Sequence, residues 1–417
     1  MSRFSFFSTG ITFGLLATLL LSACQSPGSG PQGASSGAPA DSLSWAQIQQ
    51  AARGATVEMM MWQGDPQINR FMKRYVKPAL QERYGLELKL LPGQGSQITT
   101  LLLNEKQAGR RESEIDMMWI NGETFYQLQR MDALYGPFLG RLPHARYLDL
   151  ENPYIGQDFQ RPIEGMEAPW GNVQLTVIYD SLRTPQPPKD LAALSTYLKK
   201  HPGRFTIPNE FTGMTLLKSW MIGMAPDSAL YGAFDEKLYR RYRDSLFTWI
   251  QAHRRYFWQE GATFPQRLAG LHRLFAQGEV DFTFSNNDAE VENKIYQNTF
   301  PASARAYVYR SGTIKNSHYL GIVRWARDPL ASMVVINFLL SPEAQIEKRK
   351  PRVWGDGSVL SSRKLPDSAR KAMQKAAQRR YAPARDSLTP YARQELAPAY
   401  MTRLYEDFQK MIVEGDA

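Results

Sequence analysis

The chain has a single cysteine in 417 residues. Without a second cysteine it can form no internal disulfide bond, so its fold must be stabilised by the burial of apolar side chains. The sequence contains no H-E-x-x-H motif, and its few histidines are spread along the chain, at His144, His201, His253, His272 and His318. We therefore expect neither a metal ion nor another cofactor.

The one cysteine ends an N-terminal export signal. Arg3 supplies an early positive charge, residues 11–21 are apolar, and the sequence Leu21-Ser22-Ala23-Cys24 resembles the lipobox of bacterial lipoproteins. The apolar stretch is too short for a membrane span, and a small-residue cleavage site follows it. The resemblance implies that residues 1–23 are removed and that Cys24 is lipidated. We expect a protein of the periplasm or cell envelope that is held at a membrane by its lipid and is otherwise soluble.

Residues 24–41 combine the lipidated cysteine with a predicted flexible linker. Gln25 to Ala40 consists of small, polar and proline residues with no charge, a composition that cannot bury a core. The glycines at 28, 30 and 33 satisfy G-x-G-x-x-G, and residues 33–37 satisfy G-x-S-x-G. Neither pattern follows a strand or begins a helix, so we reject both as nucleotide-binding or hydrolase motifs.

Charge does not indicate a nucleic-acid partner. The net charge is +10, but the basic residues are scattered in short groups, such as Arg110-Arg111, Lys199-Lys200 and Lys348 to Lys350. No nucleic-acid module is recognisable, so these groups are expected on solvated helix faces. About 375 residues remain after the linker, which suggests two domains at roughly 100–200 residues each.

One strand-helix-strand unit, Tyr84 to Gly122, organises the first of these domains. Leu86 to Leu91 is predicted as a strand, Ser96 begins a helix that stops at Gly109, and Ile115 to Ile120 is predicted as a buried strand. Such an order implies parallel strands, and ligands of these sheets lie beyond the carboxyl ends of the strands. The turns at those ends supply four candidate ligand-binding residues, Gln94, Ser96, Asn121 and Glu123.

A third strand, Thr56 to Trp62, is predicted just before this unit. Asp65 and Pro66 are typical of a helix start, and Pro78 should kink the helix before Gly85 ends it. Trp62 is either a core residue or an aromatic wall for a ligand, and we favour the wall because polar residues follow it directly.

The order of these elements resembles the extracellular solute-binding proteins of ABC importers, near the thiamine-, polyamine- and iron-binding receptors, several of which have no assigned ligand. The segment FLLSPEAQ is the most specific match and is structural in that family. The resemblance implies an α/β, two-lobed type II periplasmic-binding-protein fold, with a mixed sheet and flanking helices in each lobe and a hinge between them. It places 42–172 plus 306–345 in lobe 1 and 173–305 plus 346–417 in lobe 2.

The same resemblance places two segments near the hinge. Residues 169–172 are predicted as a turn before a strand at 173–179, with Trp170 and Asn172 on the floor of the ligand cleft. Packing between the domains is the alternative for Trp170. The return strand is expected at 312–324, where His318 either contacts ligand or packs at the hinge.

The second lobe offers two candidate loops. Residues 204–209 are predicted as a strand followed by a turn and a helix at 214–224, which places Asn209 and Thr212 at a helix N-terminus. A strand at 279–284 precedes Asn286 and Asp288, whose side chains offer donors and acceptors. Capping of a helix at 290–296 is their alternative role.

The leading prediction is a lipid-anchored substrate-binding component of an ABC import system that captures a small solute by hinge closure. It would be a monomer, with the permease and ATPase subunits as partners, and not an enzyme. Glu123 and Asp288, with Trp62 and Trp170, would suit an organic cation, whereas Asn286, Ser96 and the helix N-termini would equally suit an anion or a sugar. The alternatives are an anchored hydrolase, with Glu123 and Asp288 as a glycosidase-like carboxylate pair, and a scaffold lipoprotein without an enclosed pocket.

Overall fold

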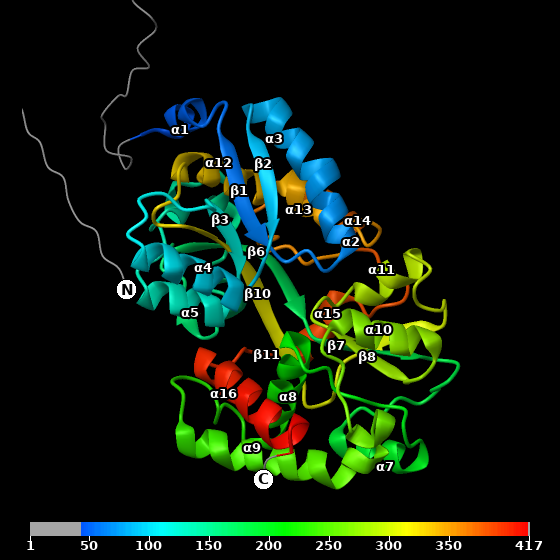
Figure 1. Ribbon diagram of the computed structural model, residues 1–417. Helices are drawn as coiled ribbons and strands as arrows, with labels where there is room; N and C mark the ends of the chain where they lie inside the picture. The colour runs from blue at the N-terminus through cyan, green and yellow to red at the C-terminus, as the bar shows by residue number, and fades with distance from the viewer. Residues whose placement is uncertain (1–42, 416–417) are drawn as a thin grey trace, which may run out of the picture. The chain divides into compact units, whose positions relative to one another are not determined.

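The computed structural model describes residues 43–415 (Figure 1). The chain divides into two units, Met1–Leu43 and Ser44–Ala417, and all elements described here belong to the second. The predicted signal peptide, Cys24 and the linker lie outside the described residues. No single helix within residues 43–415 meets the length and hydropathy needed to cross a membrane, although the bent pair Pro329–Leu339 and Pro342–Arg349 does so by length and composition alone.

The first sheet has the strand order β11-β10-β3-β1-β2. Its three N-terminal strands, β1 (Thr56–Met61), β2 (Glu87–Pro92) and β3 (Met117–Ile120), are parallel, as the sequence predicts. Their carboxyl ends point towards the middle of the molecule in Figure 1. The helices α4 (Ser96–Gln107) and α5 (Gly122–Arg130) follow β2 and β3 directly. This arrangement brings the two predicted turns to the same edge of one sheet.

The helix after β1 confirms its predicted start and stop. Asp65 accepts hydrogen bonds from the backbone N–H groups of Gln67 and Ile68, and Gly85 ends the helix with φ +65°. The segment is α2 (Pro66–Phe71), a π-helical turn η2 (Met72–Val76) and α3 (Lys77–Tyr84). The predicted kink near Pro78 thus takes the form of a π turn, which accommodates a proline that lacks a backbone N–H.

Two long strands connect the first sheet to the second. β6 (Glu167–Gln174) pairs antiparallel with β10 (Thr313–Ile322), which also pairs antiparallel with β3. The predicted turn at residues 169–172 is wrong, because these residues lie within β6. Proline there is tolerated because the register shifts between His318 and Tyr319, opposite Pro169, and such an irregularity needs no proline N–H.

The second sheet is antiparallel, with the order β8-β7-β9. β7 (Thr176–Asp180) continues from β6, and β9 (Ala304–Tyr307) precedes β10, while β8 (Phe282–Ser285) forms the other edge. The predicted strand at 204–209 is wrong. That segment joins its neighbours through single backbone hydrogen bonds, such as the bond from the Asp281 N–H to the Arg204 carbonyl (2.8 Å), and not through a ladder.

We call the parts built on the first and second sheets the first and second lobes. The second lobe packs its core against α8 (Phe211–Met224), α9 (Glu236–His253), α10 (Leu268–Gln277) and α16 (Pro398–Phe408). The predicted boundaries between lobes stay predictions, but the chain passes between the sheets at residues 174–176 and 307–313. The other short elements are α1 (Trp45–Ala51), η3 (Leu139–Arg141), η4 (Pro143–Tyr147), α6 (Pro153–Gly156), β4 (Gln157–Asp158), β5 (Arg161–Pro162), α7 (Leu191–Lys200), η5 (Arg254–Tyr256), η6 (Trp258–Gly261) and α11 (Glu290–Tyr296).

The C-terminal part combines helices with irregular segments. It contains α12 (Pro329–Leu339), α13 (Pro342–Arg349), α14 (Asp367–Ala376), α15 (Arg385–Leu388), η7 (Thr389–Tyr391), β11 (Ala392–Arg393) and η8 (Gln409–Val413). Irregular segments separate α13 from α14 and α14 from α15. α14 packs on α13, and α16 contacts both α8 and α5, so the end of the chain touches both lobes (Figure 1).

Candidate functional site

The turns after β2 and β3 lie side by side. Gln94 and Ser96 are exposed, and Asn121 begins α5 without using its side chain as a cap. A methyl group at Gly95 would lie 3.9 Å from Oγ1 of Thr124, which places the first turn beside the start of α5. Gly95 has φ +49°, a conformation that favours glycine. The structure therefore brings Gln94, Ser96 and Asn121 to one edge of the sheet.

An aromatic group fills the space beside these strand ends. Trp119 contacts Trp62 edge-on (6.4 Å between ring centroids) and lies 5.1 Å from Trp170. The same rings surround His318, with Trp119 at 4.7 Å and Trp354 at 5.7 Å. Trp62 is only partly buried, whereas Trp170 is 0% exposed. Trp170 and His318 thus occupy the interior packing positions that we gave as alternatives, whereas Trp62 and Trp119 are both only partly buried.

Sequence reasoning missed Trp119 and Trp354. Trp119 lies inside the predicted strand 115–120, two residues before the candidate Asn121. Its position next to the end of that strand was the available signal. Trp354 lies in an irregular segment far along the chain, and nothing local marks it.

His318 belongs to a buried charged group behind the aromatic rings. Its Nε2 lies 3.1 Å from Oδ2 of Asp356, which also accepts a hydrogen bond from Nζ of Lys348 (2.5 Å). Burial lowers the pKa of Lys348 to about 8 and lowers the pKa of His318 as well. Burial alone would raise the pKa of Asp356, but Lys348 and His318 hold it below its ordinary value. We interpret this group as structural support for the strand β10.

Asn172 is also held by contacts within the protein. Its Nδ2 donates to the carbonyls of Tyr154 and Asn316 (3.2 Å each) and to Oγ of Ser317 (3.1 Å). These bonds tie β6 to β10 and to α6 where the chain passes between the sheets. Asn172 is buried, so its side chain positions the crossing strands.

The second-lobe candidates Thr212 and Asn286 meet. Nδ2 of Asn286 donates to Oγ1 of Thr212 (3.3 Å), and Glu210 caps α8 by accepting from the N–H groups of Thr212 and Gly213. The helix predicted at 214–224 is present and begins earlier, at Phe211, with Glu210 as its cap. Asn209 instead donates to Oε1 of Gln409 (2.8 Å).

Asp288 is enclosed by two arginines from the C-terminal part. Its Oδ1 accepts from Nη2 of Arg379 (2.6 Å) and from Nη2 of Arg385 (2.7 Å). Burial alone would raise the pKa of Asp288, but the two guanidinium groups hold it below its ordinary value. The carboxylate is therefore already neutralised, and Glu123 and Asp288 form separate groups and not a carboxylate pair. Whether Asp288 contacts a ligand stays a prediction.

Glu123 faces a different charged group. Lys218, which is 0% exposed, donates to Oε1 of Glu395 (2.7 Å) and lies 4.5 Å above the ring of Phe159. Burial raises the pKa of Glu123 and of Asp158. Repulsion from the carboxyl groups of Glu123 and Glu395 raises the pKa of Asp158 further. Lys218 lowers both values. Lys218 therefore interacts electrostatically with three acidic side chains, those of Glu123, Asp158 and Glu395, at the contact between α5, β4 and α8.

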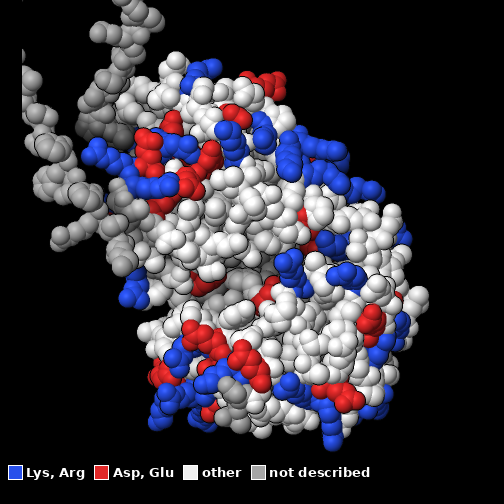
Figure 2. All heavy atoms as spheres, in the orientation of Figure 1, with Lys and Arg blue, Asp and Glu red and all other residues white. Residues whose placement is uncertain are grey.

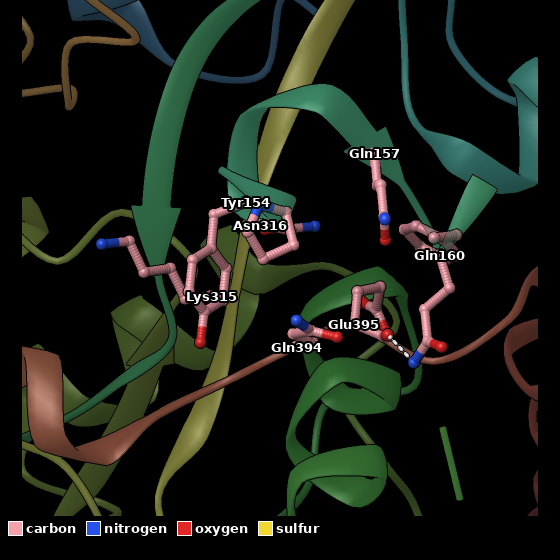
Figure 3. A pocket seen from close by; sticks show the side chains of 9 residues that line it. Tyr154, Gln157, Gln160, Lys315, Asn316, Gln394 and Glu395 are labelled. Atoms are coloured by element: carbon pink, nitrogen blue, oxygen red, sulfur yellow. Dashed lines mark hydrogen bonds between the residues drawn. The ribbon is translucent and has the colours of Figure 1, made fainter. Parts of the chain in front are cut away.

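A small cavity adjoins this group (Figure 3). It measures about 10 Å³, which is room for roughly one water molecule. Its lining comes from α6 and β4, β10 and the segment before α16, namely Pro153, Tyr154, Gln157, Phe159, Gln160, Lys315, Asn316, Gln394 and Glu395. Figure 3 shows Gln160 reaching the backbone of Glu395, which ties the turn between β4 and β5 to the segment before α16.

A buried ion pair joins the two lobes. Nζ of Lys294, on α11, lies 2.8 Å from Oδ2 of Asp65, the cap of α2, and 3.0 Å from Oε1 of Glu290. Nε2 of His272 lies 3.5 Å from the same Glu290 oxygen. Burial alone would raise the pKa of Glu290, yet Lys294 and His272 lower it to about 2.

We expect Glu290→Gln to change the acid sensitivity of the fold. A carboxyl whose pKa falls from 4.5 to about 2 on folding stabilises the protein above pH 4.5, and this stability is lost as the pH falls to about 2. At neutral pH the variant should lose about 3 kcal/mol of unfolding free energy. The loss should shrink towards zero below pH 4.5 in urea titrations at several pH values. The exposed Glu112→Gln is the matched control, and a loss that does not vary with pH would contradict the argument.

The visible face of the molecule is hollowed between the two lobes. Figure 2 shows this hollow between the part that carries α4 and α5 and the part that carries α8 and α16. Both acidic and basic side chains reach its edge, and basic atoms gather beside the position of α15. The edge of the hollow thus carries charges of both signs.

Comparisons with known proteins agree with this architecture. A family model described as bacterial extracellular solute-binding protein matches residues 74–378. Protein YnjB from Escherichia coli (strain K12) is 36% identical over 335 residues, which are 79% of this chain and 86% of that protein.

Solved structures show the same fold. The periplasmic binding protein AfuA from Actinobacillus pleuropneumoniae, with exogenous fructose-6-phosphate bound, has a TM-score of 0.59 and 13% identity and covers 86% of this chain and 98% of its own. The spermidine/putrescine ABC transporter substrate-binding protein PotD from Streptococcus pneumoniae strain Canada MDR_19A has a TM-score of 0.55 and 14% identity, with coverage of 85% and 98%. At these identities the likeness shows the two-lobed α/β fold alone.

Proposed function

The chain belongs to the bacterial extracellular solute-binding proteins, and from this premise we propose that it is the lipid-anchored, substrate-binding component of an ABC importer. The family match over residues 74–378 carries the proposal, because it spans both lobes and the strands between them. Members of the family act outside the cytoplasm, bind small solutes and work with permease and ATPase subunits. The anchor at Cys24 and delivery to the permease are the finer parts of the proposal.

Hinge closure is supported by how the lobes are joined. β6 continues into β7 through Leu175, and β9 is joined to β10 by a turn at residues 308–312, so the two sheets are connected by segments that can bend without breaking a helix. The ion pair of Lys294, on α11, with Asp65, at the start of α2, crosses from one lobe to the other. A solute that touches both lobes would favour the closed population by its differential affinity.

The proposed solute site combines the first-lobe strand ends with the second-lobe pair. Trp62, Gln94, Ser96, Asn121 and Glu123 would contact the solute from the first lobe, and Thr212 and Asn286 from the second. For Trp170, Asn172, Asn209 and Asp288 we propose a supporting role, because their polar or aromatic groups are already engaged inside the protein.

The test is native mass spectrometry of the non-lipidated Cys24→Ser protein, purified gently and then again after unfolding and refolding. We expect extra mass on the first sample that is absent from the second and that gives the formula of the solute. The absence of any adduct, together with no shift in melting temperature across cations, sugars and oxyanions, would contradict the proposal and favour an anchored hydrolase or a scaffold.

No observation favours the hydrolase alternative. Glu123 and Asp288 have separate partners, and among residues 43–415 no three acidic, histidine or cysteine side chains are arranged to hold a metal ion. The family and its structural neighbours are transport proteins.

A further inference from the structure

Four basic side chains meet where the two lobes and the C-terminal part come together. Arg349 ends α13, Arg379 lies between α14 and α15, Arg385 begins α15, and Lys315 lies on β10. Electrostatic interactions link Arg349 with Arg379 and Arg385, and Lys315 with Arg385 and Arg349. We call these four residues the cation cluster.

One buried carboxylate serves the whole cluster. Oδ1 of Asp288 takes the hydrogen bonds of both Arg379 and Arg385, and its side chain is 5% exposed. The neighbouring Asp386 is exposed, and Asp356 is already bonded to Lys348 and His318. Glu292 also interacts electrostatically with Arg379, but its Oε1 accepts the backbone N–H groups of residues 380–382. Among the described residues, Asp288 is therefore the carboxylate that bonds side chains of the cluster.

Arg349 is the member without a partner. Among the described residues its guanidinium makes no hydrogen bond or ion pair, and its Nε is sealed from solvent. Burial and the adjacent Arg385 and Arg379 lower its pKa to about 9. Lys315 likewise forms no ion pair and rests on the ring of Tyr154 (5.3 Å), and Figure 3 shows it extending away from the small cavity.

Such an arrangement is costly unless an anion completes it. Buried charges in proteins are paired, and an unpaired guanidinium forgoes strong charge-assisted hydrogen bonds. Arginine forks match the oxygens of phosphate and carboxylate groups, whereas a structural role would be met equally well by uncharged side chains. The cluster also lies next to the loop of Asn286, through Asp288, so an anion there would be close to the proposed solute site.

We propose that the cation cluster binds an oxyanion, a phosphate or carboxylate group, with Arg349 as its principal unpaired donor. This inference rests on the proposed function only where the oxyanion is part of the imported solute. Asp288 is committed to these arginines, so its carboxylate is not available to pair with an organic cation.

The test measures binding of inorganic phosphate and of citrate to the refolded protein by isothermal titration calorimetry at low ionic strength. Wild type should bind at least one of them, and Arg349→Met should weaken that binding tenfold or more. Arg352→Met, three residues away on the ring of Tyr296, is the matched control and should bind as wild type does. Without anion, Arg349→Met should keep or raise the melting temperature, because it removes a charge that its neighbours repel.

A second variant tests the inference in case Arg349→Met does not fold. Lys315→Met approaches the cluster from a different strand and should weaken the same anion. No binding of either anion by wild type would overturn the inference, as would a lower melting temperature for Arg349→Met with unchanged affinity.

Native mass spectrometry distinguishes an oxyanion that is part of the solute from one that is a free ion. A phosphate- or carboxylate-bearing adduct that Arg349→Met loses would make it part of the solute, whereas inorganic phosphate retained together with another solute would make it a free ion. A neutral or cationic adduct with no anion binding would overturn this inference and leave the receptor proposal standing.

Discussion

Lys218→Met should destabilise the protein by about 3–5 kcal/mol, the usual cost of breaking a buried ion pair by removing one partner. The lysine is 0% exposed, and its Nζ lies 2.7 Å from Oε1 of Glu395. After the substitution the Glu395 carboxylate would remain buried near Glu123 and Asp158 without its ion-pair partner. Because whole domains are stable by only about 5–15 kcal/mol, this loss should be plain in the urea midpoint.

A second substitution should restore most of the lost stability. Adding Glu395→Gln to Lys218→Met removes the uncompensated charge while keeping the side-chain shape, and most of the stability should return. Lys199→Met, on the exposed side of α7, is the matched control and should change the unfolding free energy by less than about 0.5 kcal/mol. A loss of that small size for Lys218→Met itself would show that the contact between α8 and the segment before α16 is open to water.

Cys24→Ser should move the protein almost completely from the membrane fraction to the soluble periplasmic fraction. The predicted anchor is attached to this one side chain, and each buried methylene of an acyl chain contributes about 0.8 kcal/mol to membrane binding. Fractionation of cells followed by immunoblotting would measure the shift.

Two further observations make this test specific. Ser26→Ala, in the same linker, should leave the protein in the membrane fraction. The melting temperature of Cys24→Ser, measured on the purified protein, should equal that of a wild-type chain that starts at Gln25, because the described fold begins beyond the linker. Full retention of Cys24→Ser on membranes would contradict the lipoprotein prediction and require another attachment.

Local patterns in the sequence determined much of the first lobe. The apolar runs at 56–62 and 115–120 became β1 and β3, and Asp65 with Pro66 and Gly85 marked the ends of a helix. Each of these features depends on neighbours within one or two turns, so periodicity and capping were sufficient to predict them. The two errors, at 169–172 and 204–209, concern segments whose state is set by pairing with distant strands.

The sequence by itself thus determined the order of elements, the family and the edge of the sheet at which Gln94, Ser96, Asn121 and Glu123 lie. Only the tertiary structure decided what the charged side chains do. Asp288 is bonded to arginines about 90 residues later in the chain, and Lys218 to Glu395 across 177 residues. Whether a buried carboxylate is free for a ligand depends on such distant partners, because burial makes an unpaired charge costly and the fold supplies the counter-charge from wherever the chain returns.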